Sequence, residues 1–372
     1  MCAQSRRTQI PDQLTHLDSR VLDGLVHKQI SLAARMDASA LLKISPEREF
    51  IKLALLDPPY NRRTKFIHYS DSESSKSWLD ARMAHLVEIR ERLLEDGSIW
   101  VHLDDNEVHG FKTAMDSLFG SRNFISTIIW QKTVSRDNRT IISSSHEYIL
   151  VYAKNRREFA KSRNRMPSTE AQVARYKNLD NDPRGPWTSG DLTAKAGPGR
   201  RAEQFYEVTL PSGRKVSPSP GTAWRYTFER FEELVAENRI YFSKGDSMPR
   251  VKRFLSETNG AMVPNTWWDA SEVGSMDNAK RELKREFPGK IPFETPKPIA
   301  LAERILSIGS NPGEWIVDVY GGSGTTAVAS QNLGRNWLTC ERQQNTFEEF
   351  LLPRIQANSS PFSKKFVFHL SD

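Results

Sequence analysis

A short polar and aromatic stretch, Asp57-Pro58-Pro59-Tyr60, directly follows an apolar run at residues 53–56 that predicts a buried strand. Each proline fixes its φ angle and removes an N–H group, so the turn presents carbonyl oxygens and few donors. One carboxylate, these carbonyl groups and one aromatic face suit a flat ring that bears an amine, and the exocyclic NH₂ of a nucleobase fits that description. The alternative is a rigid turn without chemistry, because proline and aspartate are both common in turns.

A glycine-rich segment at residues 318–326 joins an apolar strand, predicted at 315–319, to a helix predicted at 325–333. The glycines permit a tight turn and let a ligand approach the backbone closely. The helix N-terminus offers N–H groups and a positive dipole end to an anionic group. Glu341 follows Asp318 by 23 residues, at the tip of the next predicted strand. From that position a carboxylate binds ribose hydroxyls in nucleotide-binding α/β folds, so the segment predicts a site for a nucleoside-bearing cofactor.

Two other nucleotide motifs fit this segment less well. A phosphate-binding P-loop needs a lysine after the glycines, where Thr325 stands. An NAD-type fingerprint needs a glycine three residues after Gly324, and none is present. A glycine-rich loop without a ligand remains the plain alternative. The occurrence of Asp-Pro-Pro-Tyr near the other end of the chain favours the cofactor site.

Alternating strands and helices on both sides of a central segment must position the two turns. Apolar spacing predicts a sheet of parallel strands with helices between them. The predicted strands are 51–56, 98–103, 125–130, 148–153, 315–319 and 337–340, and the predicted helices are 39–44, 79–94, 108–118, 297–308 and 325–333. Gly97 is expected to end the second of these helices. The central segment is rich in Gly, Pro, Arg and isolated aromatic residues, with one helix at 227–237.

This pattern predicts an N-terminal arm followed by an α/β domain that is interrupted by an inserted domain. The expected divisions are 1–30 for a loosely docked arm, 31–154 for the first half of the α/β domain, 155–292 for the insertion and 293–372 for the second half. The length of 372 residues agrees with roughly two domains.

Positive charge is concentrated in the insertion. Residues 155–292 hold 25 lysines and arginines against 18 aspartates and glutamates, so their excess of seven equals the net charge of the chain, +7. An asymmetric basic segment is typical of a polyanion binder, although a basic solvated surface is common too. Candidate phosphate contacts are Arg200-Arg201, Arg214-Lys215 and the basic residues of 250–253.

Composition excludes several other classes. The hydrophobic fraction of 38% supports a core, and no run approaches the ~20 apolar residues of a membrane span. The polar N-terminus lacks the apolar core of a signal peptide, which predicts a cytoplasmic protein. Two distant cysteines exclude a disulfide framework and a cysteine-rich metal site. His146-Glu147 has no second histidine at metal-binding spacing, so we expect a structural role and no metal.

Four ordered segments together resemble the amino-methylating DNA methyltransferases of the β class. They are Asp57-Pro58-Pro59-Tyr60-Asn61, Phe293-Glu294-Thr295-Pro296-Lys297-Pro298, Gly322-Ser323-Gly324-Thr325-Thr326 and Glu341. In that class the catalytic turn comes first, the target-recognition region is central and the cofactor loop is last. The chain looks most like the modification subunits of type III restriction systems, through strings at 104–107, 146–154, 181–187 and 352–355. The resemblance runs from about Asp37 to Ile355.

The chain departs from the family pattern at three points. The cofactor loop of the family usually continues from Asp-Pro-Phe or Asp-Phe-Phe into Ala-Gly-Ser-Gly, whereas Tyr320 and Gly321 stand here for Phe and Ala. We interpret both changes as mild. The Gly-Asp-Asn-Leu that precedes the catalytic strand is reduced to Met36-Asp37-Ala38-Ser39. The chain is also shorter than typical type III modification subunits.

The resemblance implies a fold, a cofactor and a set of site residues. The fold is α/β: a Rossmann-like, mainly parallel twisted sheet of the S-adenosylmethionine-dependent methyltransferase type, circularly permuted, with an inserted target-recognition domain. S-adenosyl-L-methionine is the implied methyl donor. The implied catalytic residues are Asp57, Pro58, Pro59 and Tyr60, and the implied cofactor-binding residues are Asp37, Thr295, Lys297, Asp318, Tyr320, Gly322, Gly324, Thr325 and Glu341. For Lys297 the alternative is a solvated lysine at a helix start.

The implied reaction is methylation of adenine N6 in duplex DNA, because the family tends to carry Asp rather than Ser first in the catalytic motif when it modifies adenine. Cytosine N4 methylation, a catalytically silent DNA-binding regulator and an RNA substrate are the alternatives. Double-stranded DNA is the implied partner, with a restriction subunit and a homodimer as further candidates and no membrane. The expected location is the cytoplasm, in association with the nucleoid. Trp267-Trp268 is expected to pack in the core of the inserted domain, with stacking on DNA as the alternative.

Overall fold

The computed structural model describes residues 12–61, 64–65, 70–71, 74–168, 170–196, 202–243, 245, 247–258, 261–290, 293–358 and 366–370. The chain divides into two compact units. The first, called the sheet unit below, combines Met1–Asn164 with Pro264–Asp372, and the second, called the inserted unit, is Arg165–Val263.

A ten-stranded sheet is the framework of the sheet unit, with the strand order β1-β21-β2-β20-β19-β3-β6-β8-β7-β18. Its members are β1 (Asp12–Leu14), β2 (Ser31–Arg35), β3 (Ile51–Leu56), β6 (Leu93–Leu103), β7 (Phe124–Gln131), β8 (His146–Ala153), β18 (Trp267–Trp268), β19 (Trp315–Asp318), β20 (Asn336–Glu341) and β21 (Phe366–Leu370). Only β8 runs against its neighbours in this sheet, since it pairs antiparallel with both β6 and β7 while the other pairs are parallel. The expected mainly parallel sheet is confirmed, with β8 as a reversed strand that the sequence interpretation did not foresee.

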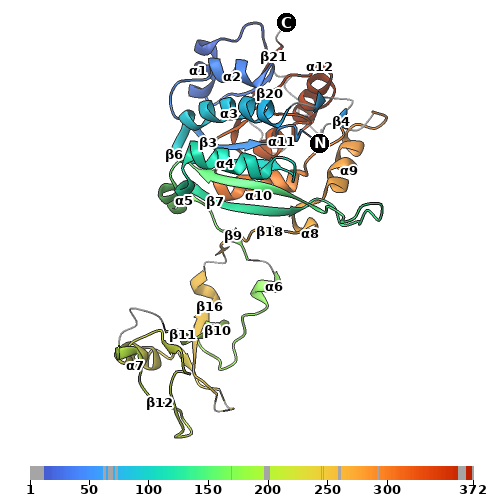
Figure 1. Ribbon diagram of the computed structural model, residues 1–372. Helices are drawn as coiled ribbons and strands as arrows, with labels where there is room; N and C mark the ends of the chain where they lie inside the picture. The colour runs from blue at the N-terminus through green and yellow to red at the C-terminus, as the bar shows by residue number, and fades with distance from the viewer. Residues whose placement is uncertain are drawn as a thin grey trace, which may run out of the picture. The chain divides into compact units, whose positions relative to one another are not determined.

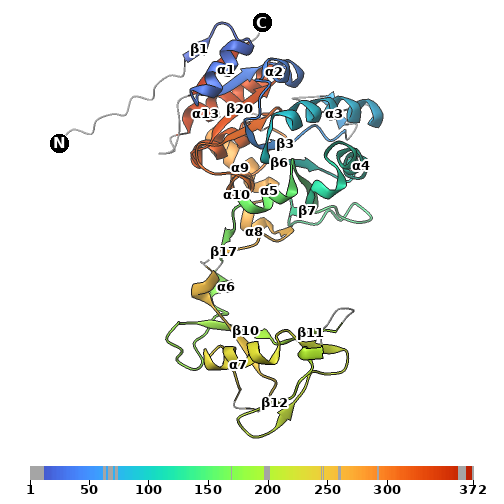
Figure 2. The same cartoon turned by 90° about the vertical axis from the view of Figure 1, so that its left-hand side faces the viewer.

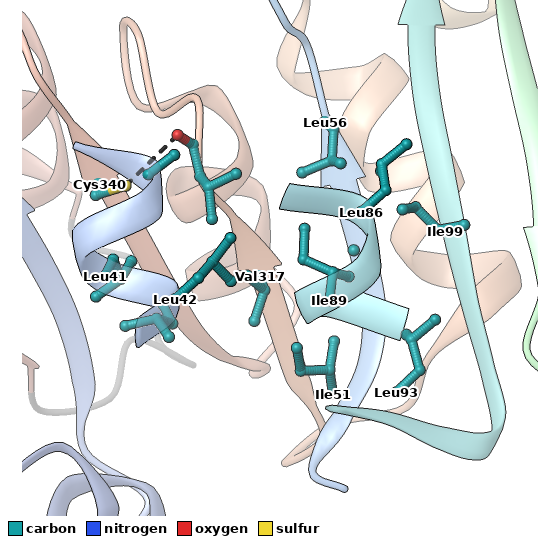
Figure 3. Close-up of a cluster of buried hydrophobic side chains, with 14 of the residues drawn as sticks. Leu41, Leu42, Ile51, Leu56, Leu86, Ile89, Leu93, Ile99, Val317 and Cys340 are labelled. Carbon is teal, nitrogen blue, oxygen red and sulfur yellow. Dashed lines mark hydrogen bonds between the residues drawn. The ribbon is translucent and has the colours of Figure 1, made fainter. Parts of the chain in front are cut away.

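One face of this sheet is covered by helices from the N-terminal part of the chain, which lie side by side in Figure 1. They are α1 (Ser19–His27), α2 (Ala38–Ile44), α3 (Ser75–Arg92) and α4 (Val108–Phe119). Alternate strand residues such as Leu56, Ile99 and Val317 face these helices and pack against Leu42 and Ile89 (Figure 3). Burial of this apolar surface is the main stabilising term of the unit.

The opposite face is covered by α5 (Arg156–Ser162), α10 (Ile299–Gly309) and α11 (Thr325–Asn332). Close packing here depends on Gly309, because a Cβ atom at that position would lie 2.5 Å from Leu53 Cδ1. The unit is completed by a short ribbon of β4 (Thr64–Lys65) and β5 (Ser70–Asp71) and by α8 (Ala270–Val273), α9 (Met276–Glu286), α12 (Gln344–Thr346), a π-helical turn η4 (Phe347–Leu351), α13 (Leu352–Ala357) and a 3₁₀ turn η1 (Ser121–Asn123).

Several expected boundaries differ from the structure. Residues 12–30 are not a loose arm: β1 pairs with β21, and α1 buries Leu22, Leu25 and Val26. Residues 1–11 lie outside the described part of the chain. Gly97 does not end a helix but lies inside β6, where a Cβ atom would come within 2.9 Å of the Ile51 carbonyl oxygen.

The insertion is shorter than the sequence suggested. Residues 155–164 and 264–292 belong to the sheet unit, so its observed limits are 165 and 263 rather than 155 and 292. The adjacent residues Trp267 and Trp268 also lie in the sheet unit, and they differ in burial. Trp268 is buried in β18 of the large sheet and stacks near Trp100, whereas Trp267 is exposed, so neither packs in the core of the insertion.

The inserted unit is built from short antiparallel strands (Figure 2). Its main sheet has β10 (Trp187–Asp191), β16 (Arg250–Phe254) and β15 (Ile240–Tyr241). Two-stranded ribbons pair β11 (Thr193–Lys195) with β14 (Thr222–Trp224), β12 (Val208–Thr209) with β13 (Lys215–Val216) and β9 (Met166–Pro167) with β17 (Ala261–Met262). Its helices are α6 (Glu170–Val173) and α7 (Phe228–Ala236), with 3₁₀ turns η2 (Ala202–Gln204) and η3 (Leu255–Thr258).

An ion cluster ties the segment before β10 to β16 in the inserted unit. The fully buried Lys252 ammonium lies 3.0 Å from Asp182 Oδ2 and also contacts the Asp180 carboxylate. Arg184 donates two further hydrogen bonds to Asp182, at 2.9 and 2.8 Å. These donors hold the pKa of Asp182 well below its usual range, against the opposing effect of burial. The string Asn181-Asp182-Pro183-Arg184 therefore has a structural role in this unit.

No helix in the described residues is both long and apolar enough to cross a membrane.

Candidate active site

The order of the strands brings the two predicted turns together. β3 and β19 are adjacent and parallel, with Val317 opposite Ala54, although they are far apart in the sequence. Their carboxyl ends therefore lie at the same edge of the sheet, and ligands of open α/β sheets bind outside such ends. The Asp-Pro-Pro-Tyr turn leaves β3 there, and the glycine-rich turn leaves β19 beside it.

A cavity of about 220 Å³ lies at this edge, wholly within the sheet unit. Twelve of the thirteen site residues expected from the sequence line it: Asp37, Asp57, Pro58, Pro59, Tyr60, Thr295, Lys297, Asp318, Tyr320, Gly322, Thr325 and Glu341. Gly324 does not line the cavity. It has a left-handed conformation (φ = 82°) directly before α11, so its role is to turn the chain into that helix.

The Asp-Pro-Pro-Tyr turn is fixed by hydrogen bonds at both ends. Trp78 Nε1 donates to the Pro59 carbonyl oxygen at 2.6 Å. Asn61 follows in a left-handed conformation and donates from Nδ2 to Glu107 Oε1 at 2.8 Å. The Tyr60 hydroxyl lies 2.8 Å from Asp57 Oδ1, within the same turn. The turn is therefore a rigid platform that carries one carboxylate and one aromatic ring.

Lys297 is buried against the Asp57 carboxylate rather than solvated. Its Nζ atom lies 2.8 Å from both carboxylate oxygens of Asp57 and 4.9 Å from the centre of the Tyr60 ring. Lys297 comes from the segment before α10. A hydrogen bond ties this segment to α11, because Thr325 Oγ1 donates to the Lys297 carbonyl oxygen at 3.1 Å. Arg354 donates in turn to Thr325 Oγ1 at 3.1 Å. Thr325 therefore connects the two halves of the site.

Two cavity residues were missed by the sequence interpretation. Glu147, on β8, is buried with Oε2 3.1 Å from the Tyr60 hydroxyl and 3.6 Å from Lys297 Nζ. A signal for it was present, because Glu147 shares its strand face with the buried Ile149 and Val151 and thus had to be an inward-facing carboxylate. We had given His146-Glu147 a purely structural role.

His102 is the second residue that was missed. It lies on β6, lines the cavity and is buried, and its Nδ1 atom has no hydrogen-bond partner in the described structure. Burial lowers the pKa of His102 to about 4, although the nearby Asp57 acts in the opposite direction. The ring is therefore neutral near pH 7 and adds no charge beside Asp57 and Lys297.

Backbone donors organise the two carboxylates beside the glycine-rich turn. Asp318 Oδ1 accepts from the Tyr320 backbone N–H at 2.9 Å, and burial raises the pKa of Asp318 to about 7. Glu341 Oε2 accepts from the Gly322 N–H at 3.0 Å, and its other oxygen accepts from the Gln343 N–H at 2.7 Å. Burial also raises the pKa of Glu341. These contacts bring Glu341 to the glycine-rich turn, as the spacing predicted.

The glycine-rich turn also depends on two close backbone approaches. Gly322 has a positive φ of 47°, and a Cβ atom at Gly321 would lie 2.9 Å from the Cys340 carbonyl oxygen and 2.6 Å from Leu351 Cδ1. A methyl group at Gly321, where the family usually has alanine, would force the neighbouring backbone or side chains of this chain to move.

The far wall of the cavity comes from α2 and α3. The Asp37 side chain accepts from the Ser39 N–H at 2.8 Å and caps α2, which is a structural reason for its presence. The Tyr320 hydroxyl lies 2.8 Å from His85 Nδ1, while His85 Nε2 lies 2.8 Å from Ser39 Oγ. Burial lowers the pKa of His85. Asp37 and Tyr320 thus face the cavity from a hydrogen-bonded wall.

No group of three or more potential metal ligands occurs in the part of the chain that the structure describes. The cavity instead gathers carboxylates from both halves of the sheet, Asp57, Glu147, Asp318 and Glu341, with Lys297 among them. Arg82 and Arg342 also line the cavity, while its carboxylates suit a ligand that brings amines, hydroxyls or a positive charge.

Comparison with protein families places the chain in the N6/N4 DNA methylases, whose family model matches residues 51–351. The match covers the catalytic turn, the insertion and the glycine-rich turn, so the chain belongs to this family. The expected resemblance to amino-methylating DNA methyltransferases is confirmed.

Curated relatives are about a quarter identical to it over the aligned regions. The Mod subunit of the type III restriction-modification enzyme StyLTI from Salmonella typhimurium is 28% identical over 75% of this chain and 46% of its own length. The type II methyltransferase M.EcaI from Enterobacter cloacae is 27% identical over 80% of this chain and 63% of its own length. The chain thus spans about half the length of the curated relatives it matches.

Among solved structures, a putative DNA modification methylase from Thermus thermophilus in complex with S-adenosyl-L-methionine aligns with 92% of this chain and 98% of its own. The TM-score is 0.47 and the sequence identity is 18%.

Proposed function

We propose that the protein transfers a methyl group from S-adenosyl-L-methionine to the N6 amine of an adenine that is flipped out of duplex DNA. The observation that carries this proposal is the single cavity shared by the Asp-Pro-Pro-Tyr turn and the glycine-rich turn. A methyl donor and an acceptor amine must meet within one enclosed space, and these turns supply the two halves of it. Membership of the N6/N4 DNA methylase family supports the same reaction class.

The residues of the cofactor half fit S-adenosylmethionine. Glu341, at the tip of β20, would bind the ribose hydroxyls, and Tyr320 and Asp318 line the cavity beside it. Asp37, Thr295 and Lys297 complete the proposed contacts, with Thr295 and Lys297 at the methionine end. When bound, the cofactor supplies a methyl group activated by a sulfonium. Buried carboxylates around the cavity favour that positive charge, and Gly322 leaves the backbone open to close approach.

The residues of the catalytic half fit an exocyclic amine. The lone pair of an aryl amine is delocalised into its ring, so the amine is a weak nucleophile. Asp57 and the Pro58 carbonyl oxygen can each accept one N–H, which favours a pyramidal nitrogen with its lone pair directed at the donor. The site thus acts by orientation and by stabilising positive charge as it develops on nitrogen. Flipping the base costs a few kcal/mol, and stacking on Tyr60, worth ~1–3 kcal/mol, offsets part of it.

The inserted unit is our proposed target-recognition domain. Its residues, 165–263, include 16 lysines and arginines against 12 aspartates and glutamates. A second proposed DNA contact is the connection between β7 and β8, residues 132–145. Ile141 and Ile142 are fully or almost fully exposed there, and Arg136 and Arg139 accompany them. Apolar side chains beside basic ones suit insertion between base pairs while the basic groups contact phosphates.

The relatives' names supply the remaining proposals. The Salmonella relative is a subunit of a type III restriction-modification enzyme, so we propose that a restriction subunit and a second copy of the chain are the partners to test first. Co-expression followed by size-exclusion chromatography tests both. Elution of the purified chain as a monomer that binds neither would oppose this proposal.

A transfer assay tests the proposed reaction. The protein is incubated with unmethylated plasmid and labelled S-adenosylmethionine, and the DNA is digested to nucleosides. N6-methyl-2′-deoxyadenosine is the expected product. N4-methylcytosine would instead establish the alternative target, and cofactor binding without transfer would favour a silent DNA-binding regulator. The matched variant Asp57→Ala is expected to bind the cofactor and to lose transfer. Retained turnover would remove the role given to Asp57.

A further inference from the structure

Glu147 contacts both of the groups that surround the catalytic carboxylate. Its side chain is almost completely buried, with Oε2 3.1 Å from the Tyr60 hydroxyl and 3.6 Å from Lys297 Nζ. Its other oxygen lies 3.5 Å from Lys132 Nζ. Asp57 and Glu147 therefore flank the same two donors, the Tyr60 hydroxyl and the Lys297 ammonium.

The arrangement of these donors opposes the role proposed for Asp57. Lys297 Nζ lies 2.8 Å from each Asp57 oxygen, so the ammonium neutralises the carboxylate that must accept an N–H from the target amine. Transfer is favoured when the ammonium withdraws and leaves the negative charge of Asp57 to the amine. A buried ammonium cannot withdraw without another anion, because an unpaired charge in the interior is strongly destabilising.

Glu147 supplies that second anion. A shift of less than 1 Å toward Glu147 would bring Lys297 Nζ, now 3.6 Å from Oε2, to the same 2.8 Å that separates it from Asp57. The Tyr60 hydroxyl carries one proton, so it donates to one carboxylate at a time. When Lys297 moves to Glu147, that hydroxyl donates to Asp57, so neither carboxylate is left without a donor. No proton is transferred between these groups in this exchange.

We propose that Glu147 is a positioning residue for methyl transfer: it accepts from the Tyr60 hydroxyl while Lys297 is on Asp57, and it receives the Lys297 ammonium when Asp57 accepts the target amine. This inference rests on the proposed function. It assigns Glu147 no contact with the methyl donor or the target base.

The variant Glu147→Gln tests the charge of the side chain while keeping its size. The glutamine can still accept from the Tyr60 hydroxyl but cannot neutralise Lys297, so the ammonium stays on Asp57. We expect the single-turnover rate at saturating cofactor and DNA to fall about tenfold to a hundredfold. The Kd values for cofactor and DNA should remain within about twofold of wild type, a split that general unfolding of the site would not produce.

The matched control is Glu158→Gln on α5. Glu158 also pairs with a lysine, Lys161 at 2.7 Å, but on the surface and outside the cavity. The single-turnover rate of the Glu158→Gln variant should equal that of wild type. A Glu147→Asp variant keeps the charge and should transfer several-fold faster than Glu147→Gln, which provides a test if the glutamine variant folds poorly.

A double variant separates positioning from packing. In Glu147→Gln with Lys297→Met, no ammonium neutralises Asp57, so the single-turnover rate at saturating cofactor should exceed that of Glu147→Gln alone. The inference is overturned if Glu147→Gln transfers at the wild-type rate, or if Glu147→Asp is no faster than Glu147→Gln. Absence of transfer by the wild-type protein would instead refute the proposed function, so the two failures are distinguishable.

Discussion

Restoring the alanine that the family usually carries before Gly-Ser-Gly should destabilise this protein. The change is Gly321→Ala, in the turn that leaves β19. The Gly321 N–H donates to the Cys340 carbonyl oxygen at 2.8 Å, which fixes the turn against β20. The new Cβ would lie 2.9 Å from that same oxygen, 2.6 Å from Thr339 Oγ1 and 2.6 Å from Leu351 Cδ1. Real Cβ contacts are almost never this short, so the backbone or both side chains must move.

The size of the effect follows from two opposing terms. Overpacking in a close-packed interior costs about 1–3 kcal/mol. Replacement of glycine by alanine lowers the entropy of the unfolded chain and returns about 0.4–1 kcal/mol. We therefore expect a net loss of about 1–2 kcal/mol in the free energy of unfolding, which corresponds to roughly 2–6 °C in Tm for a unit of this size. Because Gly322 and Glu341 adjoin the turn, cofactor affinity should fall as well.

Differential scanning calorimetry and isothermal titration of S-adenosylmethionine measure the two consequences. Gly24→Ala is the matched control. Gly24 lies inside α1, and a Cβ atom there would meet nothing within 4 Å. Alanine is the better helix former by about 1 kcal/mol, so this variant should be stabilised. A Gly321→Ala protein as stable as Gly24→Ala, with wild-type cofactor affinity, would refute the steric argument.

Three further predictions concern other parts of the molecule. Because the pKa of Asp318 is raised from 3.8 to about 7, its ionisation removes folded-state stability as the pH rises through this range. The free energy of unfolding of Asp318→Asn should therefore rise relative to wild type by up to about 4 kcal/mol between pH 4 and pH 8. Urea unfolding measures this difference, and a difference that stays constant with pH would contradict the prediction. Lys252→Met leaves the buried Asp182 with less compensation and should destabilise the inserted unit by about 3 kcal/mol, seen as faster limited proteolysis with unchanged cofactor Kd. Ile141→Ser with Ile142→Ser should weaken 2-aminopurine fluorescence at the target base severalfold, and an unchanged signal would exclude the pair from base flipping.

Apolar spacing and turn residues predicted those helices and strands whose signal lies within a short stretch of sequence. The buried strand before Asp57, the helix after Gly324 and the position of Glu341 all follow from apolar spacing and turn chemistry. The helix at Ser19–His27 also had a local signal, an N-capping Asp18 and apolar residues at helical spacing, which we did not use.

Features that depend on distant partners were not accessible in this way. The reversed direction of β8 is set by its neighbours β6 and β7, and the strand itself carries no mark of direction. Lys297 was expected at the cofactor, but its contact with Asp57 arises from the adjacency of two segments more than 200 residues apart. The limits of the insertion were misjudged because composition changes at residue 155, ten residues before the fold does.

The first and last strands of the inserted unit, β9 and β17, pair with each other. Met166–Pro167 and Ala261–Met262 form a two-stranded ribbon, directly inside the limits of residues 165 and 263. Asn164, just before the first limit, is anchored by hydrogen bonds to the Ser307, Ile308 and Ser310 carbonyl oxygens at the end of α10. A transplant cut at these two points would sever no strand of the ten-stranded sheet. Evolution or an engineer could thus exchange the whole inserted unit between homologues while the ten-stranded sheet stays intact.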